Sequence, residues 1–146
     1  MSKMPDRLYI DKEDESLYNY LKNEIFEGNE RNKELFLLAM SIGFKNQIKR
    51  SLDKKKDYVR EEYLLPEDYA LLNAVAMFEK GPEILSNRAE VFKIAEEYAH
   101  AGIKILVDEI NSSSFESYTK RFEKDIFEIY KKLELGRDYG KEISIS

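Results

Sequence analysis

The chain has 146 residues, of which 42% are hydrophobic and 36% charged, and its formal net charge at pH 7 is −5. This length suits one domain with its own core, and the negative charge excludes a global positive field, so any contact with nucleic acid has to come from a local basic patch. The lack of cysteine excludes disulfides and thiolate chemistry, and no apolar run approaches the length of a membrane span. We therefore expect a cytoplasmic protein with one helical domain over residues 1–146 and flexible ends at 1–6 and 137–146.

The N-terminal part predicts an extended segment followed by a helix. Arg7 to Ile10 reads either as a short strand or as an extended lead-in, because apolar and polar residues partly alternate there. Asp11 offers an N-cap for the first helix, and Gly28 offers its end. The apolar stripe of this helix is formed by Leu17, Tyr20 or Leu21, and Ile25.

The most apolar stretch predicts a second helix from Lys33 to Lys49. Its buried face follows helical spacing: Leu35, Phe36, Leu38, Ala39, Ile42 and Phe44. Gly43 lies in the middle of this helix, which indicates either close approach of another backbone or a bend. The charged residues that follow, 51–63, predict a linker whose second half has weak β character or forms an extended arm.

Two further helices are marked by their ends. Pro66 is typical of the first position of a helix, and Gly81 closes it. Asn87 with Glu90 has the spacing of a capping box, which predicts the start of the fourth helix. Gly102 lies near the apolar stripe of that helix and indicates close packing. The stripe itself is long: Val91, Phe92, Ala95, Tyr98, Ala99, Ile103, Leu106 and Ile110.

A fifth helix is expected from Ser113 to Gly136, with apolar residues at nearly heptad spacing. Such a face packs on one antiparallel helix, either in the same chain or in a second copy. Its aromatic residues are therefore candidates for a dimer interface: Phe115, Tyr118 and Phe122. Together the elements predict an all-α fold, a single compact bundle of about five helices, with a short N-terminal strand as an option.

A search for catalytic motifs finds little. Neither phosphate-binding loop motif is present, nor the serine elbow of hydrolases. His100 is the only histidine, and we expect a structural or surface role for it. The alternative pairs it with Glu96, four residues earlier, as metal ligands, although such pairs usually only stabilise a helix. We predict no enzyme, no cofactor and no metal site.

The segment from residue 45 to residue 60 is the one strong local concentration of positive charge. Its basic residues are Lys45, Lys49, Arg50, Lys54, Lys55, Lys56 and Arg60. They predict either contact with nucleic-acid phosphates or a solvated linker. The order of a strand at residues 7–10 and two helices also fits half of a ribbon-helix-helix protein. In that fold two chains pair their strands in the major groove, with Leu8 and Ile10 toward the core.

Three stretches of the chain resemble the small proteins that accompany DNA phosphorothioation (Dnd) systems: residues 36–50, 70–85 and 90–106. The features that match are Gly43-Phe44-Lys45, Gly81, and the run from Glu96 to Ala99 with Gly102. The resemblance implies a place in a DNA-modification and defence locus, and it implies no enzymatic activity for the chain itself. With the basic segment, it predicts a non-catalytic accessory protein that binds DNA, a partner protein of the system, or both. The alternative is a helical homo-oligomer without nucleic-acid contact.

Overall fold

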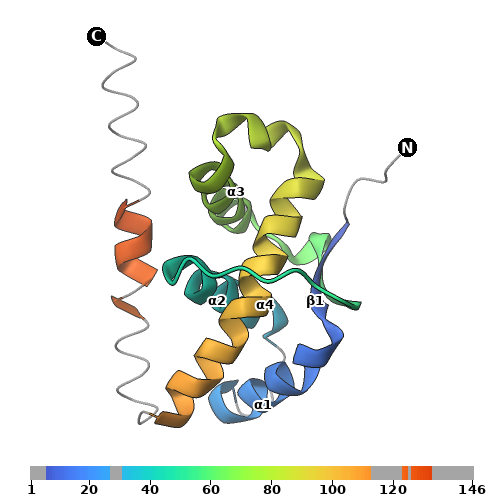
Figure 1. Cartoon of the computed structure of the whole chain (residues 1–146), viewed down its shortest axis with the longest axis vertical. Coiled ribbons are helices and arrows are strands. Elements are labelled where there is room, and N and C mark those ends of the chain that lie inside the picture. Colours follow the sequence, from blue (N-terminus) through green and yellow to red (C-terminus); the bar gives the residue numbers. More distant parts are fainter. Residues whose placement is uncertain (1–5, 27–30, 113–122, 125, 133–146) are drawn as a thin grey trace. The chain divides into compact units, whose positions relative to one another are not determined.

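The computed structural model describes residues 6–26, 31–112, 123–124 and 126–132, and it is mainly α-helical (Figure 1). The predicted all-α class and the short N-terminal strand are confirmed. The elements in chain order are β1 (Arg7–Asp11), the 3-10 turn η1 (Lys12–Asp14), α1 (Glu15–Phe26), α2 (Asn32–Lys45), β2 (Lys55–Arg60), η2 (Glu61–Tyr63), α3 (Pro66–Lys80), η3 (Pro82–Ser86) and α4 (Arg88–Ser112). None of the described helices has the length and apolar character needed to cross a membrane.

Contacts divide the chain into two compact units, residues 1–108 and 109–146. The elements from β1 to Asp108 of α4 belong to the first unit. In the second unit, residues 126–132 are helical, with Phe127 exposed. The three aromatic residues predicted as an interface, Phe115, Tyr118 and Phe122, lie outside the described residues. That interface and a single domain over the whole chain stay predictions.

The predicted N-terminal strand finds its partner far along the chain. β1 pairs antiparallel with β2, with Leu8 opposite Val59 and a register shift after Leu8. Leu8 and Ile10 are buried, as their alternation predicts. The strand is thus paired within its own chain, whereas the ribbon-helix-helix alternative needs it to pair with a second chain. In the second half of the linker, residues 58–60 belong to strand β2, which confirms its weak β character there, and residues 61–63 form the 3-10 turn η2. Strand β2 begins at Lys55, earlier than this part of the linker.

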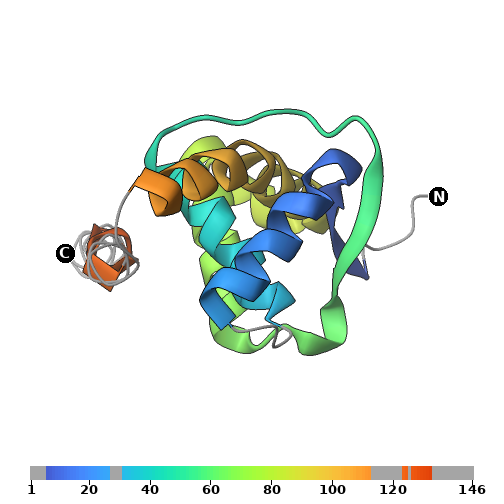
Figure 2. The same cartoon turned by 90° about the horizontal axis from the view of Figure 1, so that it is seen from below.

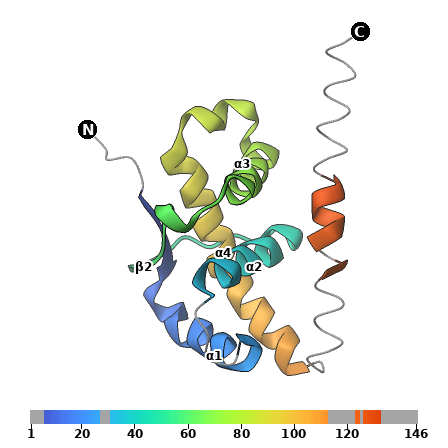
Figure 3. The ribbon, with the colours of Figure 1, turned by 180° about the vertical axis from the view of Figure 1, so that it is seen from behind.

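The core is centred on the crossing of α2 and α4, with α1, α2 and α3 arranged one after another along α4 (Figures 1 and 3). The backbones meet at two glycines. A Cβ on Gly43 would lie 2.1 Å from the carbonyl oxygen of Tyr98, and one on Gly102 would lie 1.8 Å from that of Ala39. Close approach of another backbone, one of the two interpretations of Gly43, is therefore confirmed, as is the close packing at Gly102.

Most helix ends follow the local signals. α3 begins at Pro66, and the side chain of Asn87 accepts the Glu90 N–H at 3.1 Å at the start of α4. α2 ends at Lys45, four residues earlier than predicted. The cause is Gln47, whose φ of 55° takes the left-handed conformation. The next N–H, of Ile48, then turns back to the carbonyl of Gly43 at 3.0 Å, which is the bond that closes a Schellman motif.

Candidate functional site

The basic segment leaves the end of α2, and its residues 46–54 pass over α4 along one side of the molecule before β2 begins (Figure 2). We call residues 46–54 the crossing stretch. Backbone bonds fix its course in the middle and at the far end: the N–H of Arg50 donates to the carbonyl of Glu97 on α4 at 3.1 Å, and the carbonyl of Lys54 accepts the N–H of Lys12 at 2.8 Å. The stretch is therefore an ordered surface feature of the molecule.

All seven predicted basic residues are exposed, but they are not equivalent. Three form ion pairs with acidic residues of the same chain: Lys49 with Glu79, Lys56 with Glu15, and Arg60 with Glu62. A fourth, Lys55, lies over the ring of Tyr9, with 5.5 Å from Nζ to the ring centroid. These contacts offset part of the positive charge that the sequence places here.

Arg50 and Lys54 differ from these four. Within the described residues the structure contains no ion pair for either side chain, and both lie on the crossing stretch. Acidic groups are nearby, since Asp53 adjoins Lys54 and the Glu97 carboxylate accepts the Ser51 hydroxyl at 3.4 Å. Fewer than seven of the basic residues therefore form the positive surface of the segment, and it centres on Arg50 and Lys54.

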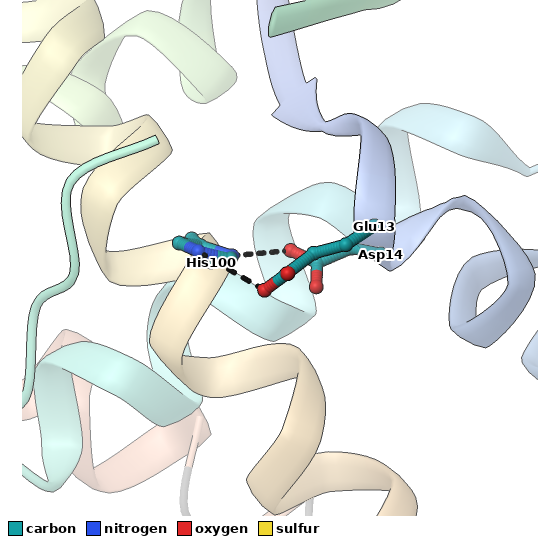
Figure 4. Close-up of side chains that lie close together, drawn as sticks. All are labelled: Glu13, Asp14 and His100. Carbon is teal, nitrogen blue, oxygen red and sulfur yellow. Dashed lines mark hydrogen bonds and ion pairs between the residues drawn. The ribbon is translucent and has the colours of Figure 1, made fainter. Parts of the chain in front are cut away.

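A second group of polar side chains lies where the end of β1 and η1 meet α4, and we call Asp11, Glu13, Asp14 and His100 the His100 cluster. Figure 4 shows Glu13, Asp14 and His100. The ring Nδ1 of His100 lies 2.6 Å from Asp14 Oδ2. Its Nε2 lies 3.6 Å from Glu13 Oε1 and 3.7 Å from Asp11 Oδ2. Asp11, Asp14 and His100 are buried, and Glu13 reaches the surface.

Local backbone geometry positions the two aspartates of the cluster. Asp11 caps η1, because its Oδ1 accepts the Glu13 N–H at 3.0 Å, while its Oδ2 accepts the N–H of Asp53 at 2.6 Å. The cluster therefore also holds the end of the crossing stretch.

Burial raises the pKa of Asp11, but the N–H donors of Glu13 and Asp53 and the nearby His100 outweigh it, so the pKa falls below its ordinary value. Burial dominates at Asp14 and raises the pKa of that carboxyl.

The row of polar residues that α4 turns toward β1 and η1 was not recognised in the sequence. Glu96 accepts the N–H of Tyr9 at 2.8 Å, His100 contacts Asp14, and Lys104 donates to Glu13 at 3.2 Å. The pairing of Glu96 with His100 considered from the sequence is therefore replaced by contacts of each with β1 or η1. Glu96, His100 and Lys104 recur every four residues and so share one helix face, which is the signal the sequence offered. The partners of Glu96 and His100 lie 87 and 86 residues away, and no sequence pattern indicates them.

Glu96 makes the stability of the fold depend on pH. Burial raises its pKa to about 7, although the N–H of Tyr9 and the charge of Lys55 oppose this and Glu97 adds to it. The folded chain then binds more protons than the unfolded chain between about pH 4.5 and 7, so stability falls as pH rises through this window, by up to roughly 3 kcal/mol. We expect Glu96→Gln to remove this fall.

Urea unfolding of both proteins from pH 4.5 to 8 measures the effect. As pH rises, the free energy of unfolding of Glu96→Gln should increase relative to that of the original chain. Glu67→Gln, at an exposed position of α3, removes the same charge and should leave the profile unchanged. Parallel profiles of Glu96→Gln and the original chain would show that the carboxylate is ionised at low pH in the folded state.

Comparison with known proteins extends the resemblance seen in the sequence. The model of the family described as DNA sulphur modification system-associated protein 4 matches residues 7–134. No curated protein and no solved structure matches the chain. The matched range contains both the crossing stretch and the His100 cluster.

Proposed function

Because the chain belongs to the family of DNA sulphur modification system-associated protein 4, we propose that it is a non-catalytic accessory protein of such a system and that it contacts DNA through the crossing stretch. Arg50 and Lys54 bind backbone phosphates in this proposal, and Lys45 and Lys55 flank them. The observation that carries it is the pair of exposed cations without ion pairs, among the described residues, on an ordered surface stretch.

The anchoring of the backbone supports this role. Since the N–H of Arg50 and the carbonyl of Lys54 are both bound within the fold, the two side chains start from fixed positions. Binding then costs only their rotamer freedom and requires no ordering of a loop. A phosphate contact also brings the counterion release that drives binding of nucleic acid, even in a protein of net charge −5.

The ion pairs lead us to expect different contributions to phosphate binding from the different basic residues. Lys49, Lys56 and Arg60 would have to leave carboxylates of their own chain in order to bind phosphate, so they contribute less than Arg50 and Lys54. The contacts are to the backbone and carry no base sequence information. A preference for sulphur-modified over ordinary DNA would therefore have to arise at the phosphates that these side chains contact.

Fluorescence anisotropy with a labelled duplex, with and without a sulphur-substituted phosphate, tests the proposal over a range of salt concentrations. We expect affinity to fall with salt, and Arg50→Gln with Lys54→Gln to weaken binding and to lower the slope of log K against log salt by about 2. The matched control is Lys80→Gln with Lys93→Gln, which removes two exposed positive charges from α3 and α4.

The control should keep the original slope. Equal losses in both double variants would mean that only net charge matters, and no salt-dependent binding to either duplex would exclude DNA as the partner of this surface. In the second case the accessory role would require a protein partner.

A further inference from the structure

The environment of His100 Nε2 is electrostatically unusual. Two carboxylate oxygens, Oε1 of Glu13 and Oδ2 of Asp11, face this nitrogen at 3.6 and 3.7 Å. Both distances are longer than a hydrogen bond, which joins nitrogen and oxygen at about 2.7–3.2 Å. An N–H at Nε2 therefore forms no hydrogen bond with either oxygen at these separations.

The other ring nitrogen already has its partner. Nδ1 lies 2.6 Å from Asp14 Oδ2, so Nε2 is the ring nitrogen left to bind a ligand. It faces the two carboxylate oxygens at distances too long for a hydrogen bond to either.

The charges of the cluster also favour a bound cation. Asp11, Glu13 and Asp14 bring three carboxylates to one imidazole, and Lys104, which pairs with Glu13 and whose charge also acts on Asp14, lies on the exposed side. Asp14 is fully buried, and within the described residues its second oxygen, Oδ1, accepts no hydrogen bond. A buried carboxylate oxygen without a donor is costly, and a cation bound in the cluster would offset part of this cost.

We propose that the His100 cluster binds one divalent transition-metal ion, held by Nε2 of His100 and the carboxylates of Glu13 and Asp11. Asp14 orients the ring through Nδ1, the role that a carboxylate commonly takes behind a metal-bound histidine. Among the described residues, side-chain ligand atoms of Glu13, Asp14 and His100 lie within 4.8 Å of one another, and Asp11 adds its Oδ2 at 3.7 Å from Nε2. Figure 4 shows both Glu13 and Asp14 directed toward the ring.

Ligands at about 2.1 Å from a common ion lie roughly 3–3.4 Å apart. The two oxygens lie 3.6 and 3.7 Å from Nε2, so binding draws them closer, and the exposed Glu13 side chain can rotate toward the ion. One nitrogen and two oxygen ligands suit Zn²⁺ or Mn²⁺ better than Mg²⁺, with Zn²⁺ the tighter of the two. Three protein ligands leave at least one position for water, reached past Glu13.

The ion would also support the crossing stretch. Asp11 uses the same oxygen, Oδ2, to hold the N–H of Asp53, so a metal that fixes Asp11 fixes the end of the stretch as well. The inference does not depend on DNA binding, since the ligands and the basic residues are different side chains.

Untagged full-length protein, stripped with a chelator, is titrated calorimetrically with Zn²⁺, Mn²⁺ and Mg²⁺. Because His100 is the only histidine, its ring signals in NMR spectra report the site without ambiguity. We expect one Zn²⁺ per chain, and Mn²⁺ should broaden the His100 signals selectively. Glu13→Gln, an exposed change that should fold normally, is expected to weaken Zn²⁺ binding at least about 10-fold, and His100→Gln should abolish it. Glu67→Gln removes an exposed carboxylate of α3 and should bind as the original chain does.

No stoichiometric binding of Zn²⁺ or Mn²⁺ would overturn the proposal, as would equal binding by Glu13→Gln and Glu67→Gln. If His100→Gln fails to fold, Glu13→Gln and the histidine signals of the original chain still decide. Unchanged signals at saturating Zn²⁺ would place any bound ion elsewhere and reject this site.

Discussion

Replacing Gly102 with alanine is expected to lower the free energy of unfolding by at least about 3 kcal/mol, or to prevent folding. The added Cβ would lie 1.8 Å from the carbonyl oxygen of Ala39 and 2.7 Å from the backbone nitrogen of Gly43, so α2 and α4 would have to move apart. Alanine has the higher helix propensity, worth about 1 kcal/mol, and this gain is too small to compensate. Urea unfolding followed by circular dichroism measures the change.

Two control variants distinguish this clash from unrelated effects of substitution. Lys93→Ala, at an exposed position of the same helix, should change stability by no more than about 0.5 kcal/mol. Ala39→Gly should not rescue Gly102→Ala, because the atom that the new methyl group meets belongs to the backbone of Ala39. Rescue by Ala39→Gly, or a Gly102→Ala variant as stable as the original chain, would contradict the backbone contact.

Replacing His100 with alanine is expected to cost about 3–5 kcal/mol in metal-free buffer. The change removes the donor to Asp14, whose side chain is fully buried, and leaves that carboxylate without a partner on either oxygen. Chelator in the buffer keeps any bound ion from contributing, so the experiment measures the contact between α4 and η1 alone.

A double-mutant cycle with Asp14→Ala isolates this contact. The two single variants should each be destabilised, and the double variant should lose less than the sum, with a coupling of at least about 1 kcal/mol. Additive losses would mean that His100 stabilises the fold through packing and that its contact with Asp14 adds nothing.

The sequence predicted those parts of the fold that depend on local patterns. The stripe of α4, the start of α3 at Pro66 and the cap at Asn87 all follow from residues within a few positions of each other. The backbone approach at Gly43 and Gly102 could also be inferred, since a glycine on the apolar face of a helix often lets another backbone come close. The end of α2 could not, because Gln47 takes a conformation that is uncommon outside glycine and asparagine.

The candidate sites were predictable in composition and much less in geometry. The seven basic residues stand out in the sequence, but the carboxylates that pair with Lys49 and Lys56 come from α3 and α1, far along the chain. His100 was noticed as the only histidine, yet its partners lie at the end of β1 and in η1, and no pattern in the sequence connects them. Both the ion pairs of the basic residues and the His100 cluster depend on contacts between segments that are distant in the sequence.

Mapping the residues that DNA covers tests the central claim, contact of DNA with the crossing stretch, most directly. Lysines of the unmodified chain are labelled with and without bound duplex, and the change at each position is read by mass spectrometry. We predict strong protection of Lys54, with Lys80 and Lys93 labelled as in the free protein. Uniform protection of all lysines, or protection of Lys80 and Lys93 with Lys54 still reactive, would contradict the account.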